Sequence, residues 1–171
     1  MTAAAETVEQ RNLAVVERMN DAFNRHDFAA AVACHAPAFD NHGHRVPRAA
    51  MTAIYQDIAT RFPDISIEVQ ECIAQGDHVV VRWIYRGTHL GIGRLPVDGG
   101  QMVGVAPTGR AFAVQHIHWF TLRNGLIVAH RACRDDVGML VQLGLLPEPP
   151  PFAIPPAETA GAAIQPRRRQ R

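Results

Sequence analysis

Three histidines lie close together in the second half of the sequence, on segments that are otherwise apolar. His116 and His118 belong to a run of aliphatic and aromatic residues at 111–122, and His130 belongs to a second run at 126–133. An imidazole with an unperturbed pKa of about 6.5 can take up or release a proton near neutral pH. We therefore identify these three histidines as candidates for general acid–base catalysis. The plainer alternative is a set of strand histidines that neighbouring groups satisfy.

The dipeptide Asn124-Gly125 separates the two runs and is a strong signal of a β-hairpin. A two-residue loop would pair His118 with Arg131. A three-residue loop, with a left-handed glycine as a bulge, would set His118 opposite His130. A shift of one residue moves every side chain of a strand to the other face, and the residues alone leave both registers open.

The rest of the chain changes from a helical to a strand pattern near residue 65. Helices are predicted over 8–23, over 28–34 after Asp27 as N-cap, from Pro47 to before 62–63, and over 137–143. Residues 39–44 form a polar stretch that breaks the helical pattern. Strands are predicted from residue 65 to a turn at 76–77 and again over 78–89, and a glycine-rich loop follows at 91–104. This order predicts an α+β fold, with one curved antiparallel sheet and helices that close a cone-shaped pocket.

The composition indicates a globular protein of one domain. Of 171 residues, 47% are hydrophobic and 19% are charged, and we expect a single domain over 1–146. Residues 147–171 are rich in Pro, Ala and Arg, so a disordered tail is predicted. The net charge of +1 gives no reason to expect a nucleic acid or a membrane as partner.

Cysteine usage and the N-terminus favour the cytoplasm. The three cysteines have unrelated spacings and form no disulfide framework. The sequence contains no apolar run long enough to span a bilayer, and the N-terminus lacks the pattern of a signal peptide. His42 and His44 have no carboxylate or cysteine at ligand spacing, so no metal site is predicted.

Further candidate side chains lie on the 78–89 strand and after the second histidine run. Trp83 and Tyr85 share one face of that strand and are read either as pocket lining or as core; His89, at the strand's end, is a further candidate for substrate binding. Asp135 and Asp136 precede the last helix. Capping of that helix is the simple role for both, and contact with a histidine or substrate is the alternative for Asp136.

Four segments together resemble a known family. They read FPDISIEV, GDHVVVRWIYRGTHLG, GVAPTGR and RNGLIVAHRACRDDVGMLVQLG. In this order they are similar to the SnoaL-like polyketide cyclases, which have the nuclear transport factor 2-like cone fold, and the resemblance covers roughly residues 8 to 146. It implies an enzyme of aromatic polyketide biosynthesis that needs neither cofactor nor metal. It also implies ring closure by an intramolecular aldol reaction, and a homodimer formed through the sheet.

The family's site residues are matched only in part. Asn41 stands where the family has a substrate-contacting asparagine, and His118 stands where it has a pocket histidine. The family's catalytic aspartate falls on Ala132. The family pattern sets position 132 on the face of His118, which favours the three-residue loop; His116, His118 and His130 would then all face one way.

These observations lead to one main hypothesis and two alternatives. The main hypothesis is a cyclase or isomerase that closes a ring in a small hydrophobic, oxygenated substrate, with His118 as base, by an aldol reaction or by hydroxyl attack on an epoxide or enone. The activity of such an enzyme would rise with an apparent pKa of about 6 to 7. The alternatives are a non-catalytic protein that binds a small hydrophobic ligand, and a hydrolase with an activated water. The hydrolase would need a carboxylate that faces the cavity.

Overall fold

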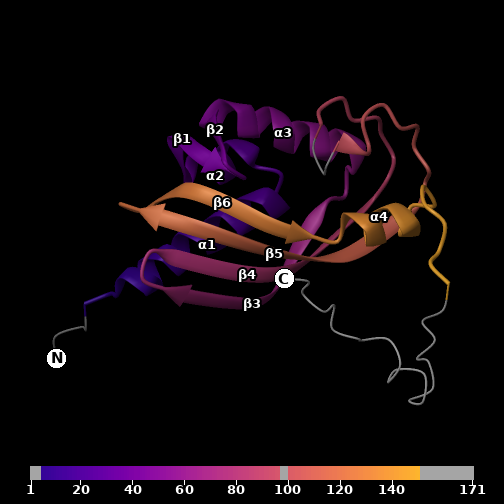
Figure 1. Ribbon diagram of the computed structural model, residues 1–171. Coiled ribbons are helices and arrows are strands. Elements are labelled where there is room, and N and C mark those ends of the chain that lie inside the picture. The colour runs from indigo at the N-terminus through magenta and orange to yellow at the C-terminus, as the bar shows by residue number, and fades with distance from the viewer. Residues whose placement is uncertain (1–4, 97–99, 151–171) are drawn as a thin grey trace, which may run out of the picture.

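The computed structural model describes residues 5–96 and 100–150 of the chain (Figure 1). The helices are α1 (Val8–Asn24), α2 (Phe28–Ala33), α3 (Arg48–Arg61) and α4 (Asp136–Gln142). The strands are β1 (His35–Asn41), β2 (His44–Pro47), β3 (Ser66–Gln75), β4 (His78–Thr88), β5 (Ala111–Arg123) and β6 (Leu126–Arg134). The predicted helices are confirmed, as are the strands predicted beyond residue 65.

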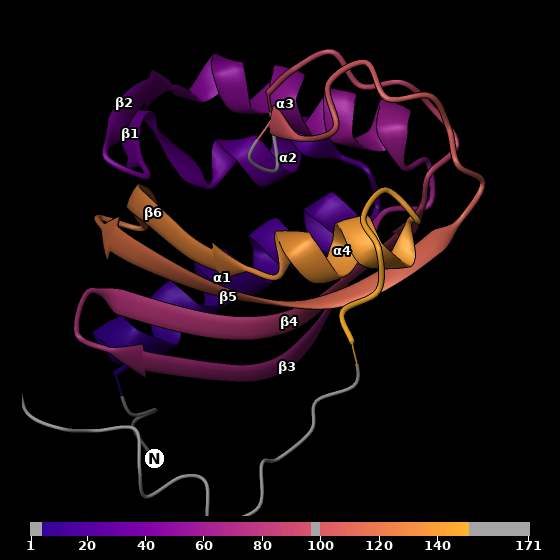
Figure 2. The same cartoon turned by 45° about the vertical axis from the view of Figure 1, so that its right-hand side comes forward.

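The strands form one sheet in the order β2-β1-β6-β5-β4-β3. The sheet is strongly curved and does not close on itself, and α1, α2 and α3 lie within its curve (Figures 1 and 2). Inward-facing residues of β4 and β5 are buried against these helices, while their neighbours in sequence face outward. The predicted α+β class is therefore confirmed.

The first two strands correct the sequence analysis. The polar stretch at 39–44 is part of a β1–β2 hairpin whose turn, His42-Gly43, has positive φ angles of +54° and +90°. β1 pairs with β6 in parallel, so the expectation of a wholly antiparallel sheet was wrong at this one pair. Pro37 and the irregular burial along β1 hide the alternation that marks a strand in sequence.

Helix α1 is fixed at both of its ends. Thr7 and Gln10 form a reciprocal capping box at the start of the helix. At the other end the Asn24 side chain donates to the Ile67 carbonyl and accepts from the Ile67 amide, both at 2.8 Å. These bonds tie the last turn of α1 to β3, and they hold the inner face of the helix over the sheet.

The glycine-rich loop after β4 is anchored on a buried arginine. The Arg61 guanidinium is inaccessible to solvent and donates to Asp57 at 2.8 Å and to the Leu95 carbonyl at 3.2 Å. A Cβ atom at Gly93 would lie 1.9 Å from this guanidinium, so only glycine fits there. The anchored loop brings Pro96 to the pocket lining.

The β5–β6 hairpin turns through two residues. Arg123 lies opposite Leu126, and the residues between them, Asn124 and Gly125, have φ angles of +51° and +73°. Positive φ at both central residues defines the type I′ turn that the Asn-Gly pair favours. The turn itself therefore follows the first of the two predicted alternatives.

A β-bulge next to this turn changes the register of the remaining pairs. Thr121 lies opposite Ala129 whereas Leu122 lies opposite Ile127, so Val128 is an extra residue on β6. Beyond the bulge, His118 lies opposite Ala132.

Both predicted pairings, of His118 with Arg131 and with His130, were thus wrong. The extra residue nevertheless leaves His130 on the same face as His118 and His116, as the three-residue loop would have done. The shared face of His118 and position 132 is also confirmed.

No helix within residues 5–96 and 100–150 is long and apolar enough to cross a membrane. Residues 147–150 carry neither helix nor strand. The rest of the predicted tail, 151–171, lies outside the described residues.

We expect Gly125→Ala to lower the free energy of unfolding by about 1 to 2 kcal/mol, since a Cβ atom is disfavoured at positive φ. No atom lies within 4 Å of the position that this Cβ would take, so the cost is conformational only. Urea unfolding followed by circular dichroism measures the change. Arg123→Ala, at an exposed position beside the turn, is the control and should stay within about 0.5 kcal/mol of wild type. Equal stability of the two variants would contradict the type I′ turn.

Candidate active site

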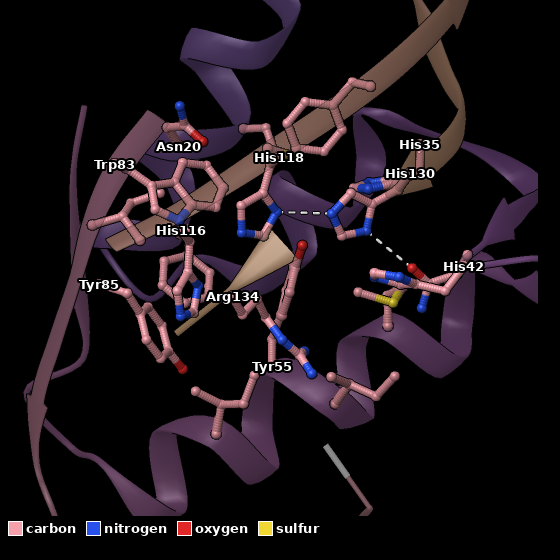
Figure 3. Close-up of a pocket in the computed structure, with 18 of the residues that line it drawn as sticks. Asn20, His35, His42, Tyr55, Trp83, Tyr85, His116, His118, His130 and Arg134 are labelled. Carbon is pink, nitrogen blue, oxygen red and sulfur yellow. Dashed lines mark hydrogen bonds between the residues drawn. The ribbon is translucent and has the colours of Figure 1, made fainter. Parts of the chain in front are cut away.

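A pocket of about 310 Å³ lies between the sheet and the helices (Figure 3). Its helix wall is apolar and includes Met19, Phe23, Met51, Ile54 and Ile58. Its sheet wall is aromatic and basic and includes Trp83, Tyr85, His116, His118, His130 and Arg134. This volume and this mixture of an apolar wall with a few polar groups are typical of a site for a small molecule.

Two histidines and an asparagine form a hydrogen-bonded chain in the sheet wall. His118 Nδ1 lies 2.8 Å from His130 Nε2, and His130 Nδ1 lies 2.9 Å from Asn41 Oδ1. Asn41 reaches His130 because β1 runs parallel to β6 at this point, with the two residues directly paired. The chain therefore joins three strands, β5, β6 and β1.

The direction of these hydrogen bonds follows from the asparagine oxygen, which can only accept. His130 Nδ1 therefore carries a proton, and a neutral His130 has none on Nε2. His118 Nδ1 must then donate to His130, which leaves His118 Nε2 with a lone pair. His118 Nε2 is buried and has no hydrogen-bond partner among the described residues, so it is a free basic atom that faces the pocket (Figure 3).

Burial keeps these histidines neutral. Removal from water lowers the pKa of His130 to about 3 and that of His116 to about 4. The pKa of His118 is lowered well below its usual value, first by burial and then by the neighbouring His130 and His116. Aromatic rings reinforce the apolar surroundings: the Trp83 ring lies 4.0 Å from His118, and Phe120 stacks on His130 at 5.0 Å.

Arg134 is the one permanently charged side chain in the pocket lining within the part of the chain that the structure describes. It lies directly opposite His116 on the adjacent strand, and its positive charge contributes to the lowered pKa of His116. Its guanidinium also donates to Asp136 at 3.1 Å. The lining therefore combines neutral imidazoles with a cation, an arrangement that suits an anionic oxygen.

Within residues 5–96 and 100–150, no aspartate or glutamate lines this pocket. Over the same residues, no group of three or more histidine, cysteine or carboxylate side chains is arranged to hold a metal ion. The proton acceptors that the lining offers are imidazoles.

Most of the predicted site residues meet in this pocket. The three histidines, Asn41, Trp83 and Tyr85 line it. The Tyr85 ring stacks on His116 at 4.7 Å, and the Trp83 indole nitrogen is buried with no hydrogen-bond partner among the described residues.

Two predicted residues do not line the pocket. His89 is buried behind it, where its ring contacts Phe62 and its Nδ1 accepts from the Thr108 amide at 3.2 Å. Asp136 reaches the pocket only through its ion pair with Arg134. The capping role belongs to Asp135, whose side chain accepts from the Gly138 amide at 2.8 Å.

Sequence reasoning missed several residues of the lining. Tyr55, Asn20 and His35 were not among the predicted site residues, although all three line the pocket. Tyr55 follows Met51 and Ile54 at helical spacing, and this spacing does predict that it faces inward. No comparable signal exists for His35, because β1 itself was not predicted.

The family model for the SnoaL-like polyketide cyclase matches residues 13–143 of the chain. The chain belongs to this family. The resemblance of the four sequence segments to the SnoaL-like polyketide cyclases is therefore confirmed.

A curated relative of this SnoaL-like chain comes from Streptomyces. It is 34% identical over 84 residues to the aklanonic acid methyl ester cyclase AcmA of Streptomyces galilaeus, a match that covers 49% of each chain. The alignment thus spans about half the length of that curated relative.

Two solved structures are similar over most of the chain. AclR of Streptomyces galilaeus, a putative hydroxylase, has 26% identity and a TM-score of 0.68, and covers 84% of this chain and 87% of its own. IdmH of Streptomyces antibioticus, a putative polyketide cyclase, has 29% identity and a TM-score of 0.64, with 78% and 98% covered.

The buried histidines predict that the protein loses stability in acid. The unfolded chain binds a proton on each histidine near pH 6.5, whereas in the folded protein burial lowers the pKa of His35 and His116 to about 4. The unfolded state therefore binds more protons in this window. The free energy of unfolding is highest above pH 6.5 and should fall towards pH 4 by up to about 1.4 kcal/mol per pH unit for each such histidine.

Urea unfolding at pH 7.5, 6.0 and 5.0 measures this slope. We expect His116→Gln to flatten it, and the exposed His44 provides the control His44→Gln, which should leave it unchanged. A stability that does not change between pH 7.5 and 5.0 would contradict neutral, buried histidines.

Proposed function

We propose that the protein is a cyclase that closes a ring in a hydrophobic polyketide-type intermediate, with His118 as general base. The observation that carries this proposal is the chain from Asn41 through His130 to His118, because it leaves an unprotonated, unpartnered Nε2 atom in an apolar pocket. The name of the relative AcmA, an aklanonic acid methyl ester cyclase, supports a substrate of the aromatic polyketide class.

The relay explains how His118 accommodates the proton that it accepts. When Nε2 takes a proton, His118 becomes an imidazolium that already donates from Nδ1 to His130. His130 in turn donates to Asn41, so the positive charge is shared along the hydrogen-bonded chain. Asn41 acts here as a positioning residue, because it selects the tautomer of both imidazoles.

Arg134 and His116 are the groups of the pocket wall that can stabilise the negative charge formed in the proposed reaction. Proton abstraction next to a carbonyl produces an enolate, whose negative oxygen needs a fixed positive partner. Arg134 lies opposite His116 in the same wall, and His116 Nε2 has no partner among the described residues. We infer that these two side chains hold the developing oxyanion.

Burial also restricts the substrates that such a base can use. Because its pKa is lowered, His118 is a weak base that is unprotonated throughout the neutral range. Proton transfer to it is efficient when the substrate proton is itself acidic, as on a carbon between two carbonyl groups. Activity should therefore be flat above about pH 6.5 and fall only at lower pH, below the window of about 6 to 7 expected from sequence.

The absence of the family's aspartate fits this scheme. Ala132, where the resemblance places that residue, lies opposite His118. The small alanine leaves the histidine pair as the proton acceptors of the wall. A hydrolase would need a carboxylate to activate water, and none lines the pocket within the described residues. A non-catalytic binding protein is the remaining alternative, and turnover decides it.

Loss of the base should abolish turnover. We expect His118→Ala to lower kcat by about 100-fold or more, and His130→Ala to lower it less because the relay only supports the base. The assay is mass spectrometry of products from a panel of aromatic polyketide intermediates with β-dicarbonyl, enone or epoxide groups. His44→Ala, which is exposed, is the matched control.

Two results would contradict a histidine base. One is full activity of His118→Ala. The other is a silent wild type together with an active Ala132→Asp variant, which would indicate a protein that binds without catalysing.

We also propose that a second copy of the chain covers the outer face of the sheet. Ile73, Val80 and Trp119 are directly paired across β3, β4 and β5, and Ile73 and Trp119 are 69% and 50% exposed. Val80 between them is partly exposed, and an apolar row of this kind on a protein surface is typical of an interface.

Ile73→Lys combined with Trp119→Lys should convert a wild-type dimer into a monomer in size-exclusion chromatography with light scattering. Val137→Lys, on the exposed face of α4, is the control and should remain dimeric. A monomeric wild type would contradict the proposal.

A further inference from the structure

Ring closure of the proposed kind needs a proton donor as well as a base. When a carbanion attacks a carbonyl, or a hydroxyl opens an epoxide, negative charge collects on the oxygen of the group that is attacked. The neutral chain His118–His130–Asn41 is oriented to accept a proton at His118 Nε2, so it cannot donate one at the same moment. Ala132, where the resemblance places the family's catalytic aspartate, has no proton to give.

The helix wall supplies a group of the required kind. Tyr55 projects from α3, and its hydroxyl points across the pocket toward the His118–His130 pair (Figure 3). Its ring packs edge-on against Phe23 at 5.2 Å and at a tilt against Phe28 at 5.8 Å. These contacts with α1 and α2 fix the direction of the ring, so the hydroxyl is held in place before a substrate enters.

The Tyr55 hydroxyl is available to a ligand. It forms no hydrogen bond with another described residue. The ring itself packs against aromatic and apolar side chains. Burial raises the pKa of Tyr55 above its usual value, so the phenol keeps its proton at neutral pH. A phenol that lines the pocket without a protein partner gains a hydrogen bond when a substrate oxygen accepts from it.

The other pocket groups are less suited to this role. The Arg134 guanidinium is suited to stabilise an anion by charge and hydrogen bonds rather than to transfer a proton. The Tyr85 hydroxyl is directed away from the His118–His130 pair (Figure 3).

We propose that Tyr55 is the catalytic proton donor, opposite the histidine base, and that the substrate is a ketone, aldehyde or epoxide whose oxygen binds to the Tyr55 hydroxyl. This inference rests on the proposed cyclase function and names its acceptor group.

The protons and electrons balance without a co-reactant. His118 Nε2 removes a proton from the nucleophilic carbon or hydroxyl, and the new C–C or C–O bond forms from the electron pair left behind. The C=O π bond or the epoxide C–O bond breaks, and its electron pair takes the proton of Tyr55. The imidazolium of His118 then returns its proton to the Tyr55 phenolate, so the net reaction is an isomerisation.

A carbonyl probe tests the donor directly. 1-Tetralone with a ¹³C-labelled carbonyl is bound to the full-length protein, and its carbonyl stretch is read by isotope-edited infrared spectroscopy. We expect a shift to lower frequency in wild type, and loss of this shift together with about fivefold weaker binding in Tyr55→Phe. Tetralin, which lacks the oxygen, should bind wild type and Tyr55→Phe equally, which shows that the pocket is intact. Gln56→Ala, on the exposed side of α3, is the matched control and should retain the shift.

The outcomes distinguish a failure of the Tyr55 assignment from a failure of the proposed cyclase function. A carbonyl stretch that is unshifted in wild type, or equally shifted in Tyr55→Phe, overturns the assignment of Tyr55. With a substrate found in the panel, Tyr55→Phe should lower kcat about 100-fold or more and change KM little; an unchanged kcat also overturns it. A Tyr55-dependent shift without turnover of any substrate by wild type supports the donor position and counts against the cyclase.

Discussion

The extra residue in β6 is the constraint on which the site depends. Without the bulge at Val128, the two-residue turn would place Arg131 on the pocket face and His130 on the outer face. With it, His130 meets His118 at 2.8 Å inside. Arg131 instead pairs with Asp40 on the outer surface at 2.5 Å. The single inserted residue thus places the neutral imidazole of His130, instead of the charged Arg131 side chain, in the wall of a small cavity. An additional unpaired charge there would lower the free energy of unfolding by several kcal/mol.

Much of this arrangement is predictable because its signals are local. The alternation along 78–88, the Asn-Gly turn and the helix stripes each follow from a short window of sequence. The bulge has no such signal, since the run from Ile127 to His130 reads as an ordinary strand. The β1 strand is hidden by Pro37 and by its dependence on β6, which is distant in sequence. His89 was a candidate because it ends a pocket strand, but the chain leaves the sheet there and buries the ring behind Phe62.

Burial determines what chemistry the histidines can perform. In water, clustered imidazoles would share protons near neutral pH, whereas desolvation keeps them unprotonated here. The result is a weak base, and a weak base is effective only if the charge that forms is stabilised elsewhere. In the proposed mechanism, the relay through His130 to Asn41 would stabilise the cation that forms on the base, and Arg134 would stabilise the anion that forms on the substrate. The His130–Asn41 relay and Arg134 lie in the same wall of the pocket, so neither has to move for the other to act.

In the proposed mechanism, the division between sheet and helix wall would allow the reaction to proceed without the aspartate that the resemblance places at Ala132. One carboxyl group that acts first as base and then as acid must reach both ends of the reaction. Here the base lies on β5 and the phenol of Tyr55 lies on α3, across the pocket. A substrate held between these walls meets its acceptor and its donor at the same time, with both already in the protonation state that the first step requires. The proposed reaction then does not need a single residue that acts as both base and acid. It needs a fixed distance between the two walls, which the anchored α1 helix and the bulged hairpin maintain.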